Sequence, residues 1–234
     1  MQRILITGSN RGIGLELVRQ YLGEGDVYVF ATCRNPDKAQ QLQELTELYA
    51  GLIQVLQMDI NDEDSIAAAA SVVAASVEGL DLLINNAGIG GDDHGRLMGQ
   101  LTASEVGRVI TTNAVSPLIV TQAFRGLLKR GLNPRVVMIS SGMGSLERTA
   151  GRSYAYRMSK AAMNMAARVL AFDGAMAGVT SATVNPGWVR TDMGGAKAAL
   201  APEESARALR ALFKRLSPAD SGKFFQYDGS ELPW

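Results

Sequence analysis

Short apolar segments alternate with longer segments of helical periodicity along the chain. RILIT at residues 3–7 is continuously apolar but for its ends, and LELVRQYL at residues 15–22 follows it after a glycine-containing turn. A continuously apolar run is typical of a strand buried on both faces, whereas apolar residues at three- and four-residue intervals indicate a helix. Repeated strand–helix alternation predicts a parallel sheet with right-handed crossovers, and hence an α/β, doubly wound fold with helices on both faces.

The same alternation covers all 234 residues without a low-complexity linker or an internal repeat, so we expect one domain, 1–234. Pro117 falls inside the longest helical stretch and predicts an irregularity there. We expect about seven strands, at 3–7, 27–32, 52–58, 80–85, 135–140, 179–184 and 223–227, and helices at 15–22, 36–49, 62–77, 102–130, 156–176 and 202–216.

Composition and charge exclude several classes of partner. The formal net charge is zero, which gives no support to a nucleic-acid partner, and no apolar run is long enough to span a bilayer. The single cysteine, Cys33, excludes an intrachain disulfide. We expect a cytoplasmic protein that acts on a small molecule. His94 lies near Asp92 and Asp93 in a glycine-rich segment, and we assign no metal site to it.

The first turn, TGSNRGIG, places Gly8, Gly12 and Gly14 between the first strand and the first helix. Glycines let a backbone approach a pyrophosphate closely, and a helix N-terminus offers free N–H groups and partial positive charge. The spacing G-x-x-x-G-x-G differs from the commoner G-x-G-x-x-G, and an ordinary strand-to-helix turn is the alternative. Its position at the first strand–helix junction favours dinucleotide binding.

The end of the second strand indicates which dinucleotide. An acid there hydrogen-bonds the ribose hydroxyls of NAD, but this strand ends in FATCRNP, with Arg34 in that region and Asp37 only beyond Pro36. An arginine fork suits a 2′-phosphate, and Arg11 in the glycine turn adds a second positive charge. The alternative is a pair of solvated surface arginines. We predict NADP(H), with NAD(H) less favoured.

The segment SYAYRMSKAAMNM contains two tyrosines close to one lysine. On a helix Tyr156 and Lys160 are four residues apart and share a face, whereas Tyr154 is paired with Met158. A nearby ammonium favours the phenolate and lowers the pKa of a phenol, so Tyr156 is the candidate proton donor and acceptor. A Y-x-x-x-K pair alone is common on helix surfaces.

The preceding strand strengthens this interpretation. RVVMISSGMGS places Ser140 and Ser141 at the carboxyl end of a central strand, where ligands bind in open parallel sheets. A hydroxyl there can hydrogen-bond a substrate carbonyl. Ser141 lies farther out and is the preferred candidate, with Ser140 supporting it.

These motifs together resemble the short-chain dehydrogenase/reductase family, which has a single-domain Rossmann-type fold, and they cover most of the chain. TGSNRGIG resembles the family's cofactor turn, INNAG its N-N-A-G segment, TTNAVSP its active-site asparagine, ISS and YRMSK its serine, tyrosine and lysine, and NPGWVRTDM its P-G segment. The tail GKFFQYDGSELPW and ATCRNP resemble a carbonyl-reductase-like branch that includes C-factor and sniffer proteins. One departure is the 15-residue gap from Ser141 to Tyr156, two longer than the common spacing.

The resemblance implies an NADP(H)-dependent reduction of an aldehyde or ketone. Tyr156 protonates the oxygen, Ser141 holds it, Lys160 lowers the tyrosine pKa and bonds the ribose, and Asn113 anchors a water. The implied catalytic residues are Asn113, Ser141, Tyr156 and Lys160. The predicted cofactor-binding residues are Gly8, Ser9, Arg11, Gly12, Ile13, Gly14, Arg34, Asp59, Ile60, Asn86, Ala87, Gly88, Tyr156, Lys160, Pro186, Gly187, Val189 and Thr191.

Two other functions remain open at this stage. One is a signalling or regulatory protein that binds NADP(H) with little or no turnover, since fold does not fix function. The other is a nucleotide-sugar epimerase or dehydratase, for which the chain is short. The resemblance implies that the helices at 102–130 and 152–177 pair in oligomeric relatives, so we expect a homodimer or homotetramer, with a monomer as the alternative.

Overall fold

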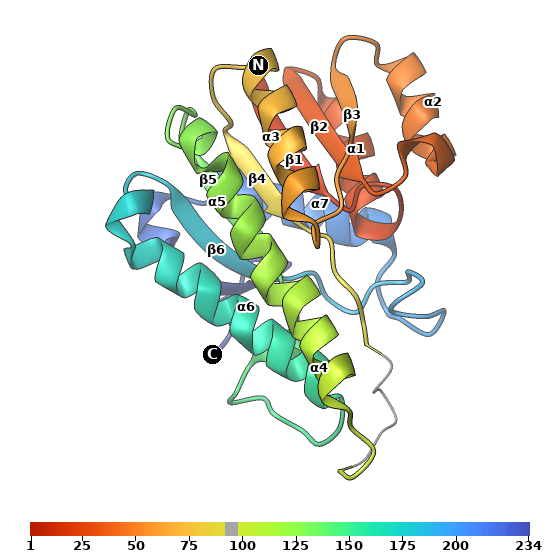
Figure 1. Ribbon diagram of the computed structural model, residues 1–234, viewed down its shortest axis with the longest axis vertical. Helices are drawn as coiled ribbons and strands as arrows, with labels where there is room; N and C mark the ends of the chain where they lie inside the picture. Colours follow the sequence, from red (N-terminus) through yellow and green to blue (C-terminus); the bar gives the residue numbers. More distant parts are fainter. Residues whose placement is uncertain (92–97) are drawn as a thin grey trace.

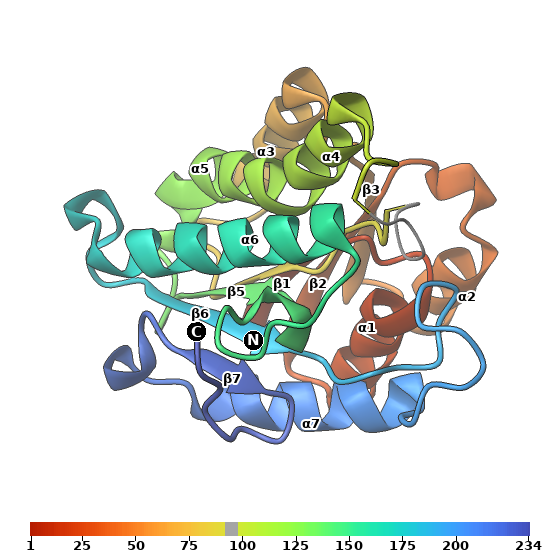
Figure 2. The ribbon, with the colours of Figure 1, turned by 90° about the horizontal axis from the view of Figure 1, so that it is seen from below.

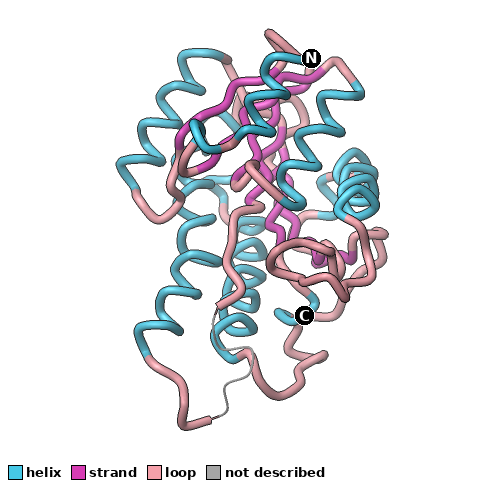
Figure 3. Tube along the Cα trace, turned by 90° about the vertical axis from the view of Figure 1, so that its right-hand side faces the viewer, coloured by secondary structure: helices cyan, strands magenta, loops and turns pink. Residues whose placement is uncertain are grey.

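The computed structural model describes residues 1–91 and 98–234. The proposed absence of a metal site at His94, Asp92 and Asp93 therefore concerns residues outside the described part of the chain. Strands run through the centre of the molecule with helices on both sides (Figure 1, Figure 3).

Seven parallel strands form one sheet, in the order β3-β2-β1-β4-β5-β6-β7. Strands β2 and β3 therefore lie on one side of β1, and β4 to β7 lie on its other side. This reversal of direction at β1 confirms the predicted doubly wound fold. The strands are β1 (Gln2–Thr7), β2 (Val27–Cys33), β3 (Ile53–Gln57), β4 (Leu82–Asn85), β5 (Arg135–Ile139), β6 (Thr180–Asn185) and β7 (Phe224–Gln226).

The helices cover the two faces of the sheet, as Figure 2 shows. One apolar core joins the sheet to α1, α2 and α7, and the other joins it to α3, α5 and α6. Both faces of the central strands are therefore covered, which is why β1, β2, β4 and β5 are mainly apolar rather than alternating in polarity. The helices are α1 (Gly12–Glu24), α2 (Gln40–Leu48), α3 (Glu63–Ser76), α4 (Ala103–Ile110), α5 (Ser116–Leu128), α6 (Tyr154–Phe172) and α7 (Pro202–Arg215).

The long helix expected at 102–130 is interrupted, as Pro117 suggested. Helix α4 passes into a π-helical turn at Thr111–Val115, and α5 begins at Ser116 with Pro117 in its first turn. A proline is tolerated at a helix start because its missing N–H would have no partner there. The π-helical turn includes Asn113, and such turns often occur at functional sites.

The helix expected at 36–49 is also divided. A 3₁₀ turn at Pro36–Lys38 is followed by Ala39, which is not helical, and only then by α2. Within the described residues, no helix combines the length and the apolar character that crossing a bilayer requires.

Candidate active site

The glycine turn between β1 and α1 has the geometry of a phosphate cradle. Gly8 and Gly12 have backbone φ angles of 66° and 55°. Residues with a Cβ rarely adopt this left-handed conformation. A Cβ on Gly14 would lie 2.4 Å from the Gly8 carbonyl oxygen. The sequence-predicted glycines are therefore required by the turn itself.

The N-terminus of α1 faces out of this turn without a capping side chain. Arg11 occupies the N-cap and makes no side-chain capping bond, and the first turn contains no acid. Free N–H groups and the helix dipole at such an end favour an anion. The residues present thus fit the pyrophosphate of a dinucleotide.

The two arginines predicted for the 2′-phosphate lie in different surroundings. Arg34 is exposed and directly follows β2, the neighbour of β1 in the sheet. Arg11 donates to the Asp192 carboxylate at 2.6 Å, which links the glycine turn to the segment after β6.

Cys33, the last residue of β2, is buried, and its burial raises the pKa of its thiol.

The segment after β4 is fixed against the glycine turn. The Asn86 side-chain amide donates to the backbone oxygens of Thr7 and Gly8, at 2.8 and 3.1 Å. A Cβ on Gly8 would lie 2.9 Å from Ala87 Cα, so the two segments are in close backbone contact. Asn86 and Ala87 therefore adjoin the cradle, where the sequence predicts cofactor contacts.

Asn113 is buried and holds the backbone that follows this segment. Its side-chain oxygen accepts from Ile89 N at 2.8 Å, and its amide donates to Ile89 O at 2.8 Å and Ser159 Oγ at 3.0 Å. A Cβ on Gly88 would lie 3.0 Å from Asn113 Oδ1 and 3.7 Å from Lys160 Nζ. Asn113 thus lies beside Lys160. That Asn113 anchors a water molecule stays a prediction.

Ser141 and Tyr156 are brought together although 15 residues separate them. Ser141 is the N-cap of a 3₁₀ turn at Gly142–Gly144, where its hydroxyl accepts from Met143 N at 3.1 Å. Its side chain is also hydrogen-bonded to that of Tyr156. The extra length of the intervening loop has not separated the two hydroxyls.

Lys160 lies one helical turn beyond Tyr156, with Nζ 5.7 Å from the centre of the tyrosine ring. It donates to Ile139 O at 2.9 Å, and burial lowers its pKa to about 8. Burial raises the pKa of Tyr156, while the hydrogen bond with Ser141 acts in the opposite direction. The net shift is upward, unlike the lowering expected from Lys160, because desolvation of the phenolate is the larger effect.

These hydroxyls face a cavity of about 480 Å³ at the carboxyl edge of the sheet. Ligands bind at this edge in open parallel sheets, and the cavity continues to Ile13 at the start of α1. Its lining joins the catalytic candidates to the segment after β6. The lining residues are Ile13, Ser140, Ser141, Gly142, Met143, Tyr156, Asn185, Pro186, Gly187, Trp188, Val189, Thr191, Met193 and Gly194.

The segment at 187–200 covers one side of this cavity and is held largely by its own contacts. Leu200 N donates to Trp188 O and Arg190 N to Leu200 O, at 3.0 and 2.9 Å. The Trp188 indole donates to Gly194 O at 2.9 Å, although the side chain is 58% exposed. Trp188 is therefore a wall residue of the cavity.

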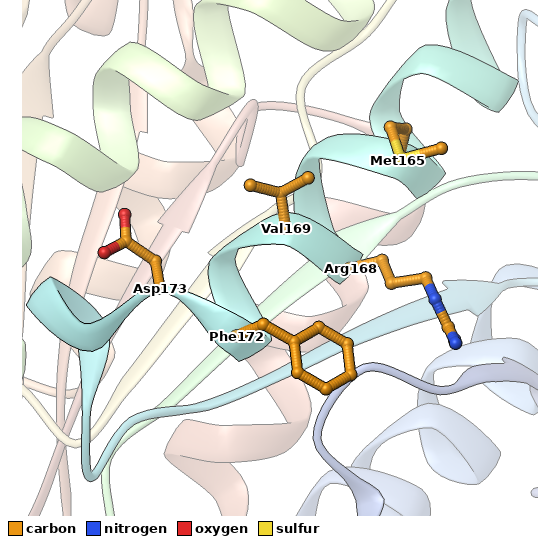
Figure 4. Close-up of a pocket in the computed structure, with 5 residues that line it drawn as sticks. All are labelled: Met165, Arg168, Val169, Phe172 and Asp173. Carbon is orange, nitrogen blue, oxygen red and sulfur yellow. The ribbon is translucent and has the colours of Figure 1, made fainter.

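A second hollow, of about 450 Å³, lies on the outer face of α6 and is lined by Met165, Arg168, Val169, Phe172 and Asp173 (Figure 4). None of the catalytic candidates lines it, so it is not the active-site candidate. It is an exposed apolar face on one of the helices predicted to pair in an oligomer.

Sequence reasoning missed Asn164, and it gave no partner for the C-terminal residue Trp234. Asn164 follows Lys160 by four residues and is therefore on the same helix face as Tyr156 and Lys160, a signal available from the spacing. Trp234 O accepts from Glu147 N at 3.0 Å and from Ser145 Oγ at 3.2 Å, which ties the tail to the loop before α6. No local pattern predicts that tertiary contact.

Comparison with known proteins identifies the family. The family model for the short chain dehydrogenase matches residues 2–200. C-signal from Myxococcus xanthus is 44% identical over 156 residues, which covers 66% of this chain and 93% of that protein. The chain therefore belongs to the short-chain dehydrogenase family, which confirms the resemblance of its motifs to that family.

Solved structures agree over the whole length. The carbonyl reductase Sniffer of D. melanogaster superposes with a TM-score of 0.93 at 32% identity and covers all of both chains. An NADPH-bound carbonyl reductase from chicken fatty liver superposes with a TM-score of 0.92 at 34% identity, covering all of this chain and 94% of that one. These likenesses confirm the predicted carbonyl-reductase-like branch.

Proposed function

We propose that this protein is an NADP(H)-dependent reductase that converts an aldehyde or ketone to an alcohol. The observation that carries the proposal is the hydrogen-bonded pair of Ser141 and Tyr156 hydroxyls, with the Lys160 ammonium beside the tyrosine ring, on the wall of one cavity. Hydride addition to a carbonyl builds negative charge on oxygen, and two fixed hydroxyl donors stabilise that charge.

When bound, the dinucleotide supplies the hydride. Tyr156 donates its proton to the substrate oxygen, and its raised pKa keeps that proton in place at neutral pH. Ser141 donates a second hydrogen bond to the same oxygen. Lys160, whose pKa of about 8 leaves it mostly protonated at neutral pH, offsets the negative charge left on the phenolate.

The cavity lining indicates an uncharged substrate. Among the described lining residues none carries a charged side chain, and Met143, Trp188 and Met193 are large and apolar. A charged substrate would lose its hydration there without gaining a partner. We therefore expect apolar or aromatic carbonyl compounds to be better substrates than keto acids.

Cofactor preference rests on Arg34 and Arg11. Arg34 is exposed after β2, and Arg11 reaches from the glycine turn, so both offer guanidinium groups near the same strand ends. The NADPH-bound relative from chicken supports this preference. A fluorescence titration with NADPH and NADH tests it, and NADH binding at least as tight as NADPH would contradict the role of Arg34.

The activity is tested by following NADPH oxidation with a panel of apolar, aromatic and charged carbonyls. Wild type and Tyr156→Phe are compared after both are shown to bind NADPH. We expect turnover by wild type and a loss on the order of 10²- to 10⁴-fold in the variant, since this is the usual contribution of a positioned general acid. Equal rates for the two proteins would contradict the proposed role of Tyr156.

The likeness to C-signal favours one alternative, an NADP(H)-binding signalling protein with little or no turnover. The same panel distinguishes the two functions. Tight NADPH binding by wild type, with no oxidation by any carbonyl, would support the signalling alternative.

A further inference from the structure

The turn that carries Ser141 is attached on both sides to one buried side chain of α6. Ser140 Oγ donates to Asn164 Oδ1 at 2.6 Å, and Asn164 Nδ2 donates to Gly144 O at 3.2 Å. Both hydrogen bonds are buried. In the sequence, Ser141 lies between Ser140 and Gly144, the two residues of the turn that bond to Asn164. The Asn164 amide therefore closes a ring around the turn at 140–144.

The chemistry of the partners fixes the orientation of this amide. A carbonyl oxygen such as that of Gly144 only accepts, so the Asn164 nitrogen must face it. The Asn164 oxygen then accepts from the Ser140 hydroxyl at 2.6 Å, a much shorter contact than the 3.4 Å from this hydroxyl to Lys160 O. An apolar side chain of similar size would make neither bond and would leave the buried Gly144 carbonyl without this donor.

The turn is also in close contact with the helix that carries Tyr156. A Cβ on Gly144 would lie 2.8 Å from Lys160 C and 2.9 Å from Lys160 Cβ. Asn164 is one helical turn beyond Lys160 and two beyond Tyr156, so one rigid helix bears the phenol, the ammonium and the amide. A shift of the turn relative to α6 thus changes the distance between the two hydroxyls.

We propose that Asn164 is a positioning residue that sets the Ser141 hydroxyl against the Tyr156 hydroxyl by holding the turn at 140–144 to α6. The proposal rests on the proposed reductase function and deepens it. A displacement of about 1 Å in a catalytic group lowers rates by up to about 10²-fold, so the effect falls on kcat rather than on cofactor binding.

The test compares Asn164→Leu with Ser181→Ala as a matched control. Ser181 Oγ donates to Ala167 O at 2.8 Å, so the control also removes a buried hydrogen bond between the sheet and α6, farther along the helix. We expect kcat of Asn164→Leu to fall on the order of 10- to 100-fold with NADPH affinity within twofold of wild type. Ser181→Ala should lose stability but keep kcat.

Ser140→Ala provides a second variant in case Asn164→Leu does not fold, since it removes only one of the two bonds. We expect a smaller loss of kcat, and the double variant should lose no more than Asn164→Leu alone because the two residues act as one unit. A folded Asn164→Leu or Ser140→Ala with kcat within twofold of wild type would overturn the proposal.

Two further measurements separate this proposal from the proposed function. If Tyr156→Phe is inactive while Asn164→Leu is fully active, only the positioning role fails. If wild type has no turnover, amide hydrogen exchange at residues 141–144 still tests whether Asn164 holds the turn in place. Faster exchange there in Asn164→Leu, and not in Ser181→Ala, supports the positioning role, and unchanged exchange overturns it.

Discussion

Two segments frame the cavity, and they are held in place by different kinds of contact. The turn at 140–144 is fixed by buried hydrogen bonds to α6 and by direct backbone packing against Lys160. The segment at 187–200 is held by its own backbone bonds and by an exposed ion pair from Asp192 to Arg11. The first arrangement is set before any ligand binds, whereas the second can adapt at small cost.

This difference assigns separate tasks to the two segments. In the proposed reaction, charge stabilisation needs donors that are already in place, and we expect the Ser141 side to meet that need. The Trp188 side is held by contacts within its own segment and by a surface ion pair, so we expect this side to adapt to the substrate more readily than the turn at 140–144. Changes to the first segment should therefore alter kcat, and changes to the second should alter KM.

Among changes to these two segments, the largest effect is expected from Ser141→Ala. Loss of one donor to a developing oxyanion costs on the order of 10²- to 10³-fold in kcat, and NADPH affinity should stay near that of wild type. Steady-state kinetics with the best carbonyl of the panel measures this. A variant that loses affinity for NADPH but keeps kcat would place Ser141 in cofactor binding instead.

Gly144→Ala should have the next largest effect. The new Cβ would lie within 3 Å of Lys160 backbone atoms, so either the turn or α6 must move, with a loss of stability of about 1–3 kcal/mol and a lower kcat. Gly151→Ala in the same loop is the control, since a Cβ there meets nothing within 4 Å. Thermal unfolding and kcat measured on both variants check this, and equal behaviour would refute the close packing.

Lys160→Met should change how stability depends on pH. Burial lowers the pKa of Lys160 from 10.5 to about 8, so between these values the unfolded chain holds a proton that the folded chain lacks. The stability of wild type therefore rises with pH in this window, relative to Lys160→Met, by at most about 1.4 kcal/mol per pH unit, and this contribution is lost as pH falls through about 8. Denaturant unfolding from pH 7 to 10 tests the sign. Parallel curves for the two proteins would mean that the lysine is not desolvated.

The smallest effect is expected from Asp192→Asn. The ion pair with Arg11 is about three-quarters exposed at the aspartate, and such pairs contribute about 0–1 kcal/mol. We expect kcat to be unchanged, KM for the carbonyl to change by less than about threefold, and NADPH to bind slightly more tightly because Arg11 is released. A large fall in kcat would show that the segment at 187–200 is part of the fixed machinery.

The sequence predicts the fold well because the signals are local and repeated. Most strands are mainly apolar runs, with β6 (TSATVN) the clearest exception. The tight first turn is marked by glycines at its positive-φ positions, Gly8 and Gly12. The break between α4 and α5 was indicated by Pro117, but the π-helical turn around Asn113 was not. The helix at 36–49 was predicted as continuous because nothing local marks the break at Ala39.

The candidate site is predictable as a set of residues but not as a set of contacts. Helical spacing selected Tyr156 over Tyr154 and paired it with Lys160, and the structure places both beside Ser141. The upward pKa shift of Tyr156 depends on how deeply the phenol is buried, which no spacing reveals. The attachment of Trp234 to Ser145 joins residues 89 apart, beyond the reach of any local pattern.

The most direct test of the reductase function follows the hydride itself. Wild type is supplied with NADPH carrying deuterium at the transferable nicotinamide position and with a carbonyl from the panel, and the product is analysed by mass spectrometry. Our account predicts an alcohol with one deuterium on the former carbonyl carbon, and little product from Tyr156→Phe under the same conditions. An unlabelled alcohol, or labelled product formed equally fast by Tyr156→Phe, would contradict it.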